Sequence, residues 1–406
     1  MTRSLPDLAA RREWHLAGGP TASRGPRRRQ AADAARGYDR AVHLPARTSP
    51  RSPGPAGGWR PDRLLGPGFE ERGLGPATLV RAADRPDRPR GVVLHVHGYN
   101  DYFFQEHLAR AVVAAGHVFY AVDLRRAGRS LLGHDHVDGR DHVHHDGPGA
   151  DDALPPHYVA SLREAAADLS AAAHAVRELE PGLPLVVHAH STGGLSAALW
   201  AHAVRDDPAH GPDLLVLNSP FFSLSGSRLA DAGRSAVLEV LGRRRPLTVV
   251  SANPSEYAAH QHTSRGGRWE FDITLKRPDG LPARAGWLRT VTRAQARLAR
   301  GLAVPGPVLV ARSDSSGPDR PDNPRLDAQD TVLDVGRIAA LTPRVGPDTT
   351  PLVVPGGVHD LALSADAPRH AYLDGVLGWL DTRLPDPRDH PDHRDDPDRR
   401  DDEERP

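Results

Sequence analysis

The segment Ala189–Gly193 constrains the fold of this chain more than any other stretch of its sequence. An apolar run, Leu185–Val187, precedes it, and small and apolar residues, Gly194–Trp200, follow it. This order predicts a strand, a sharp turn and a helix, with Ser191 at the apex of the turn. Small neighbours suit such a turn because strand and helix pack closely on either side of it. The serine hydroxyl would then lie beside the first backbone N–H groups of a helix.

Composition excludes several classes of protein. The 406 residues include 52 basic and 52 acidic side chains, so no net charge favours binding to nucleic acid. Cysteine is absent, which excludes disulfides and thiol nucleophiles. No apolar run approaches the ~18 residues of a membrane span, and the N-terminus lacks the apolar core of a secretory signal. We therefore expect a cytoplasmic protein without stable membrane insertion. Lys276 is the only lysine, which we interpret as coding bias.

The chain divides into three predicted parts. Residues 1–60 are rich in Arg, Pro and Gly and are expected to be disordered, like the charged tail of residues 384–406. Residues 61–383 are expected to form one α/β domain. Within that domain, an insertion over about residues 219–300, after the sixth strand, interrupts the pattern and is expected to cap the active site.

Strands and helices alternate through the predicted domain. Near-continuous apolar strands separated by helices indicate a mostly parallel sheet with helices on both faces. The expected strands are 92–97, 117–122, 185–187, 213–218, 307–311 and 352–355. The expected helices are 106–115, 161–180, 287–302, 332–341 and 369–383.

A serine hydroxyl is a poor nucleophile at neutral pH, so a histidine must take its proton and a carboxylate must orient that histidine. Where the serine sits on a strand–turn–helix apex, the acid and then the histidine follow it in the chain. His359 follows the strand Leu352–Val354 through a glycine-rich loop and is the predicted base. Asp330 is the predicted acid, because the helix over 332–341 and the last strand fit between it and His359. Asp314 is the alternative acid, because a shorter loop could place it beside the histidine.

An oxyanion formed during attack by the serine needs two N–H donors already in place. One predicted donor is the backbone N–H of Thr192, directly after the serine. The other is the backbone N–H of Tyr99, because Gly98 allows a tight turn after the strand over 92–97.

Five motifs now occur in one order: His97–Tyr99, Asp123–Ser130, Ala189–Gly193, Asp330–Asp334 and Gly357–Asp360. Together they are similar to the monoacylglycerol-lipase and serine-aminopeptidase-like branch of the α/β-hydrolases. The resemblance implies an α/β-hydrolase fold in which Ser191 is the nucleophile, Asp330 the acid and His359 the base. It also implies that Tyr99 and Thr192 supply the oxyanion N–H groups, and that no cofactor is required. The resemblance spans roughly residues 63–383.

The function expected from the resemblance is hydrolysis of a carboxylic ester, either lipid-like or a small acyl ester, through an acyl-enzyme. An amide hydrolase of the prolyl-aminopeptidase type is the alternative; it would need an acidic anchor, for which Glu256 and Glu270 are candidates. A non-catalytic binding protein of the same fold is the third hypothesis. The sequence leaves the oligomeric state open.

Several histidines lie outside the motifs. Residues 134–146 are rich in His and Asp, but their spacing matches no defined metal site, so no metal is predicted. His188 is interpreted as a packed strand residue, and His190 as a position in the turn that tolerates many side chains.

Overall fold

The computed structural model describes residues 58–132, 154–207, 209–224, 228–251 and 255–384. The predicted N-terminal segment and C-terminal tail lie almost wholly outside these ranges, and the His/Asp-rich residues 134–146 lie outside them entirely. In the ranges given, no helix is long and apolar enough to cross a membrane.

A nine-stranded sheet has the order β1-β2-β3-β5-β4-β6-β7-β10-β11. Strands β1 to β3 pair antiparallel with one another, and β3 pairs antiparallel with β5. From β5 to β11 every pair is parallel, which confirms the predicted mostly parallel sheet. The strands are β1 (Arg60–Asp62), β2 (Gly66–Leu74), β3 (Ala77–Ala82), β4 (Val92–Val96), β5 (Val118–Asp123), β6 (Leu185–His190), β7 (Leu214–Asn218), β10 (Val308–Ser313) and β11 (Thr349–Val354).

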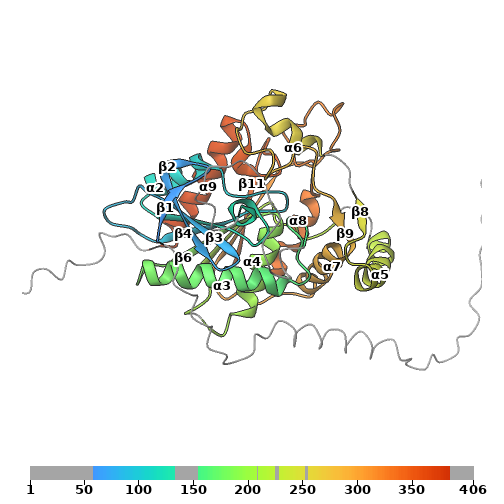
Figure 1. Cartoon of the computed structure of the whole chain (residues 1–406), viewed down its shortest axis with the longest axis horizontal. Coiled ribbons are helices and arrows are strands. Elements are labelled where there is room, and N and C mark those ends of the chain that lie inside the picture. The colour runs from blue at the N-terminus through green and yellow to red at the C-terminus, as the bar shows by residue number, and fades with distance from the viewer. Residues whose placement is uncertain (1–57, 133–153, 208, 225–227, 252–254, 385–406) are drawn as a thin grey trace, which may run out of the picture. The chain divides into compact units, whose positions relative to one another are not determined.

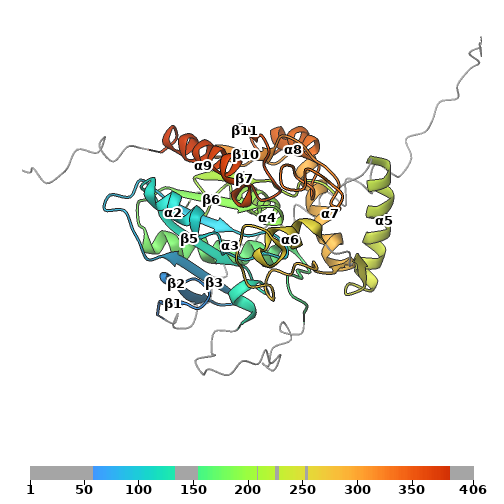
Figure 2. The same ribbon diagram turned by 90° about the horizontal axis from the view of Figure 1, so that it is seen from above.

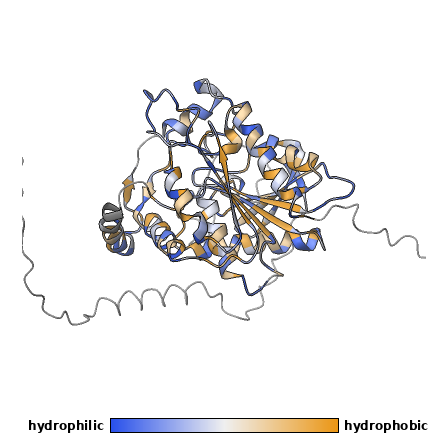
Figure 3. Cartoon of the chain, turned by 180° about the vertical axis from the view of Figure 1, so that it is seen from behind, coloured by the Kyte–Doolittle hydropathy of each residue, from blue (hydrophilic) through white to orange (hydrophobic). Residues whose placement is uncertain are grey.

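Helices cover both faces of the sheet (Figure 1). On β4, Leu94 and Val96 join the core under one set of helices while Val93 joins the other, as the two-residue period of a strand requires. Hydropathy colouring shows the strands as the apolar centre (Figure 3). One face carries α2 (Glu106–Ala114) and α9 (Asp366–Asp381), and the other carries α3 (Leu162–Leu179), α4 (Thr192–Ala203), α7 (Ala285–Ala299) and α8 (Val335–Leu341).

The segment between β7 and β10 is the predicted insertion. Helix α5 packs on α7, on the side away from the sheet (Figure 2). The insertion follows the seventh strand in chain order instead of the sixth, because the structure contains the additional three-residue strand β1. Its elements are α5 (Arg228–Arg244), β8 (Val249–Ser251), α6 (Glu256–Gln261), β9 (Ala283–Arg284) and α7. Short 3₁₀ turns complete the described elements: η1 (Gly128–Leu131), η2 (Thr263–Arg265), η3 (Thr342–Arg344) and η4 (Leu361–Leu363).

Some predicted helix boundaries were wrong for local reasons. The helix expected over 332–341 begins at Val335, because Asp334 caps it by accepting the N–H of Arg337. The helix expected over 287–302 ends at Ala299, shortly before Gly301 adopts a φ of 102°.

Candidate active site

Ser191 occupies the turn between β6 and α4 in a backbone conformation that residues other than glycine rarely adopt. Its φ is 53° and its ψ is −117°, which is strained backbone for a residue other than glycine. The turn is held on both sides: the Ser191 N–H donates to the carbonyl of Asn218, and the Ser191 carbonyl accepts from the N–H of Phe221. The predicted strand, sharp turn and helix are thus present, with the serine at the apex.

Close backbone packing explains the small residues of this turn. A Cβ atom on Gly193 would lie 2.3 Å from the carbonyl oxygen of His97. A Cβ on Gly98 would lie 3.1 Å from both the Ser191 Cβ and the His190 Nδ1. The turn after β4 and the turn after β6 therefore touch, and glycine is required where they meet.

Three side chains predicted from chain order meet at the carboxyl ends of the parallel strands. Nε2 of His359 lies 3.0 Å from the Ser191 hydroxyl, and Nδ1 lies 3.1 Å from Oδ2 of Asp330. Asp330 is fully buried, and its other oxygen accepts the backbone N–H groups of Val332 and Leu333. These two bonds fix the carboxylate so that only one oxygen faces the imidazole.

Asp314, the alternative acid, lies elsewhere. Its carboxylate accepts the N–H of Gly356 at 3.0 Å and the Ser315 hydroxyl at 3.3 Å. Burial acts to raise the pKa of Asp314, but the bond from Gly356 lowers it below the ordinary value. Among the described contacts Asp314 makes none with His359, so Asp330 is the aspartate that bonds this histidine.

The two residues predicted to supply the N–H donors lie on the two touching turns. Thr192 is the first residue of α4, and Tyr99 lies in the turn after β4 that touches the serine turn. Within the part of the chain that the structure describes, neither N–H has an acceptor. The phenol of Tyr99 donates to the carbonyl of Pro282, and its ring lies 4.2 Å from the ring of Trp287.

The insertion lies over this region. Tyr257 of α6 accepts the N–H of Asp360 through its hydroxyl, and its ring approaches His359 edge-on at 5.7 Å. From α7, Gln295 donates to the carbonyl of Phe221. Ser191 itself is only 8% exposed.

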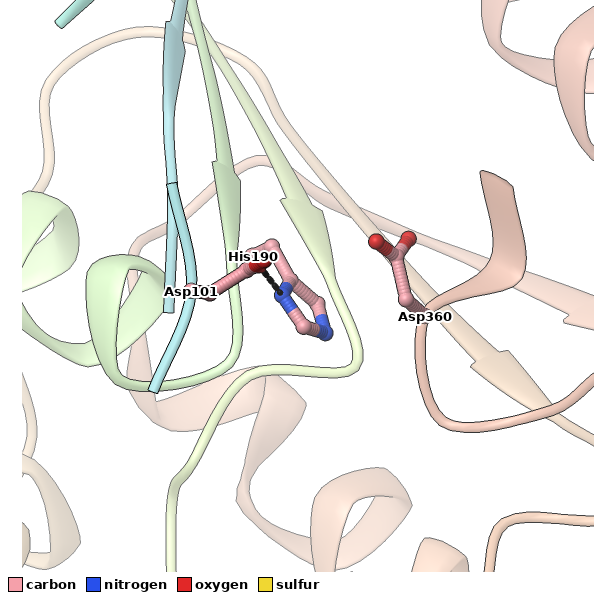
Figure 4. A group of neighbouring side chains, drawn as sticks. All are labelled: Asp101, His190 and Asp360. Carbon is pink, nitrogen blue, oxygen red and sulfur yellow. Dashed lines mark ion pairs between the residues drawn. The ribbon is translucent and has the colours of Figure 1, made fainter. Parts of the chain in front are cut away.

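A second buried cluster adjoins the serine turn, and sequence reasoning missed it. Asp101, His190 and Asp360 offer ligand atoms within 4.8 Å of one another, and the imidazole lies between the two carboxylates (Figure 4). His190 Nδ1 is 3.4 Å from Asp101, and Lys276 Nζ is 2.8 Å from the other Asp101 oxygen. The expectation that the position of His190 tolerates many side chains was therefore wrong: this ring is buried and flanked by charge.

The cluster shifts the pKa values of its members. Burial acts to lower the pKa of His190, but Asp360 and Asp101 raise it above its ordinary value. Burial acts to raise the pKa of Asp101, but Lys276 and His190 hold it well below its ordinary value. The cluster thus favours the charged form of each group.

Two further histidines form a separate chain. His188 bonds Tyr372 at 2.6 Å and His95 at 2.8 Å, and burial lowers the pKa of His188 to about 4. His188 is therefore a packed strand residue, as predicted.

The sheet order and the strand–turn–helix with its apical serine define a hydrolase of the α/β-hydrolase fold. The model of the serine aminopeptidase S33 family matches residues 87–315, more than half of the chain, and the chain belongs to this family. The resemblance inferred from the motifs is thereby confirmed.

Solved structures show the same fold. The monoglyceride lipase of Saccharomyces cerevisiae, solved with a substrate analog, is 15% identical at a TM-score of 0.55, over 78% of this chain and 95% of that one. The monoacylglycerol lipase of Paleococcus ferrophilus is 18% identical at a TM-score of 0.51, over 73% of this chain and 96% of that one. No curated protein matches the chain.

Proposed function

We propose that this protein is a serine hydrolase that cleaves carboxylic esters through an acyl-enzyme. Ser191 is the nucleophile, His359 the base and Asp330 the acid. The observation that carries the proposal is the continuous chain of contacts from the Ser191 hydroxyl through both nitrogens of His359 to Asp330. The strained turn that presents the serine supports the same assignment.

The contacts support a distinct role for each group. With Asp330 accepting from Nδ1–H, the His359 Nε2 carries the lone pair and takes the Ser191 proton as the hydroxyl attacks the ester carbonyl. The tetrahedral intermediate then collapses, and the imidazolium returns that proton to the leaving alcohol. Water repeats the sequence on the acyl-enzyme and releases the acid.

The backbone N–H groups of Tyr99 and Thr192 are the proposed oxyanion donors. Their positions on two touching turns, and the absence of an acceptor for either among the described residues, support this role. Preorganised donors of this kind stabilise the charge without reorganisation during the reaction.

A small cavity beside these donors favours a short acyl group. It has a volume of about 50 Å³, and Leu195, Trp287 and Val291 are among its apolar walls, together with Tyr99 and Thr192. A cavity of ~150 Å³ holds benzene, so this one has room for only a few carbon atoms. We expect kcat/KM for p-nitrophenyl esters to be highest at about two to four acyl carbons. A maximum at long chains would contradict this assignment.

Fluorophosphonate labelling tests the central proposal. The folded protein is expected to react at Ser191, and Ser191→Ala should lose both labelling and esterase activity while its melting temperature stays close to that of the parent. Labelling of Ser191→Ala equal to that of the parent would refute the nucleophile assignment.

Parallel assays of esters and amino-acid anilides separate the ester hydrolase from the amide alternative. An aminopeptidase needs an acidic anchor for the free amine of its substrate, but the side chain of Glu270, one of the two candidates, is 79% exposed. We therefore expect p-nitrophenyl butyrate to be the better substrate.

A further inference from the structure

Lys276 is a buried cation, and it is the only lysine among the many arginines of this chain. It lies in the insertion between η2 and β9, with 4% of its surface exposed, and its partner Asp101 is 1% exposed. The two atoms in contact, Nζ and Oδ1, are 2.8 Å apart. An unpaired charge at this depth is strongly destabilising, so each residue depends on the other.

Around Lys276, the insertion bonds the turn that carries Tyr99. Asn100 exchanges two hydrogen bonds with the backbone of Arg277, one in each direction. Tyr102 accepts the N–H of Asp272 through its hydroxyl. With the bond from the Tyr99 phenol to the insertion, four consecutive residues, 99–102, are held by the segment 272–282.

The remaining oxygen of Asp101 extends the contact to the serine turn. It faces Nδ1 of His190, the residue directly before Ser191. On the other side of the imidazole lies Asp360, directly after His359 (Figure 4). Two buried carboxylates thus lie beside the buried ammonium of Lys276 and the imidazole of His190.

The same three side chains could instead hold a metal, but their bonds favour charge balance. One oxygen of Asp360 accepts from Asn218 and from the N–H of Ala362, and the other accepts from Gln105. Lys276 occupies an oxygen of Asp101. A divalent ion would have to displace these donors and would lie close to an ammonium group.

We propose that Lys276 is a positioning residue for the reaction: through Asp101 and His190 it holds the turn that carries the Tyr99 N–H against the turn that carries Ser191. This inference rests on the proposed function and adds to it a group that touches no reacting atom. The insertion thereby contributes to the geometry of the oxyanion donors and does more than cover the site.

A charge-balance cycle tests the proposal. Lys276→Met removes the ammonium and keeps the length of the side chain, while the double variant Lys276→Met with Asp101→Asn removes both charges. For a short ester we expect kcat of the single variant to fall by roughly 10- to 100-fold with little change in KM, since misplacement by ~1 Å costs on the order of 10²-fold. The double variant should recover most of the lost kcat. Melting temperatures should follow the same order.

Arg85→Met is the control for loss of a cation from a buried carboxylate: the side chain of Arg85 is 51% exposed, but its partner Glu180 is 3% exposed. Glu180 precedes β6 and Ser191 follows it, so the length of the strand, about 20 Å, separates them. This variant should lower the melting temperature and leave kcat unchanged. An equal loss of kcat in Arg85→Met and Lys276→Met would reduce Lys276 to a structural role.

Three further results would overturn the proposal. The first is a kcat of Lys276→Met equal to that of the parent, and the second is a double variant that recovers none of the lost kcat. The third is a loss of activity and stability on chelation that is reversed by adding zinc, which would make the cluster a metal site. An inactive parent protein would refute the proposed function instead, since the melting temperatures still report on the charge coupling.

Discussion

Replacing Asp330 by asparagine perturbs the site at a single atom. Oδ1 of Asp330 accepts two backbone N–H groups, from Val332 and Leu333, at 2.9 and 2.8 Å. An asparagine must keep its carbonyl oxygen on these donors, so its NH₂ group replaces the oxygen that faces Nδ1 of His359. Nδ1 of His359 must then accept a hydrogen bond from this NH₂ group instead of donating one. The proton moves to Nε2, the atom that should take the proton of Ser191.

The expected loss is large because the geometry stays intact while the tautomer becomes wrong. Loss of the orienting carboxylate in such a site lowers kcat by roughly 10⁴-fold, equivalent to ~5.5 kcal/mol. We expect this loss in kcat/KM for p-nitrophenyl butyrate. Asp314→Asn is the control, since Asp314 is more exposed and bonds Gly356 instead; it should retain activity within about threefold. Comparable activity of the two variants would refute the assignment of the acid.

Two further predictions concern the serine turn. Gly193→Ala places a methyl group 2.3 Å from the carbonyl of His97, and we expect unfolding in urea to show a loss of at least ~1–3 kcal/mol; unchanged stability would contradict the close contact of the two turns. His190 has a raised pKa, so its stabilisation is complete below its ordinary value of 6.5 and is lost as pH rises through the raised value. The free energy of unfolding should therefore fall as pH rises above 6.5, and His190→Gln should flatten this decline. Buried His188, with its pKa lowered to about 4, acts on the acid side instead, because it must take up a proton on unfolding below pH 6.5.

The parts of the fold that could be predicted are those with a local cause. Five of the six parallel strands are buried almost throughout, so each is largely a continuous apolar run that can be recognised from the sequence. Among the antiparallel strands, β1 has only three residues, and β2 mixes buried with more exposed residues and includes three glycines, which gives a weaker signal. Chain order then limited the acid to a few aspartates after Ser191, and the packing of the loops favoured Asp330 over Asp314.

The charge cluster could not be predicted in the same way, because its members share no local pattern. Lys276 and Asp101 are 175 residues apart and meet only because the insertion folds back on the turn after β4. His190 directly precedes the serine, yet nothing in a strand of alternating His and small residues indicates that this ring lies between two carboxylates. One signal was present in the sequence: a single lysine among many arginines. Arginine binds carboxylates as a planar fork, whereas lysine brings a compact point charge to one oxygen. The second oxygen of Asp101 faces His190, so the cation can bond only one oxygen, and this requires a lysine. Lys276→Arg should therefore fail to restore the kcat of the parent, although it retains the charge.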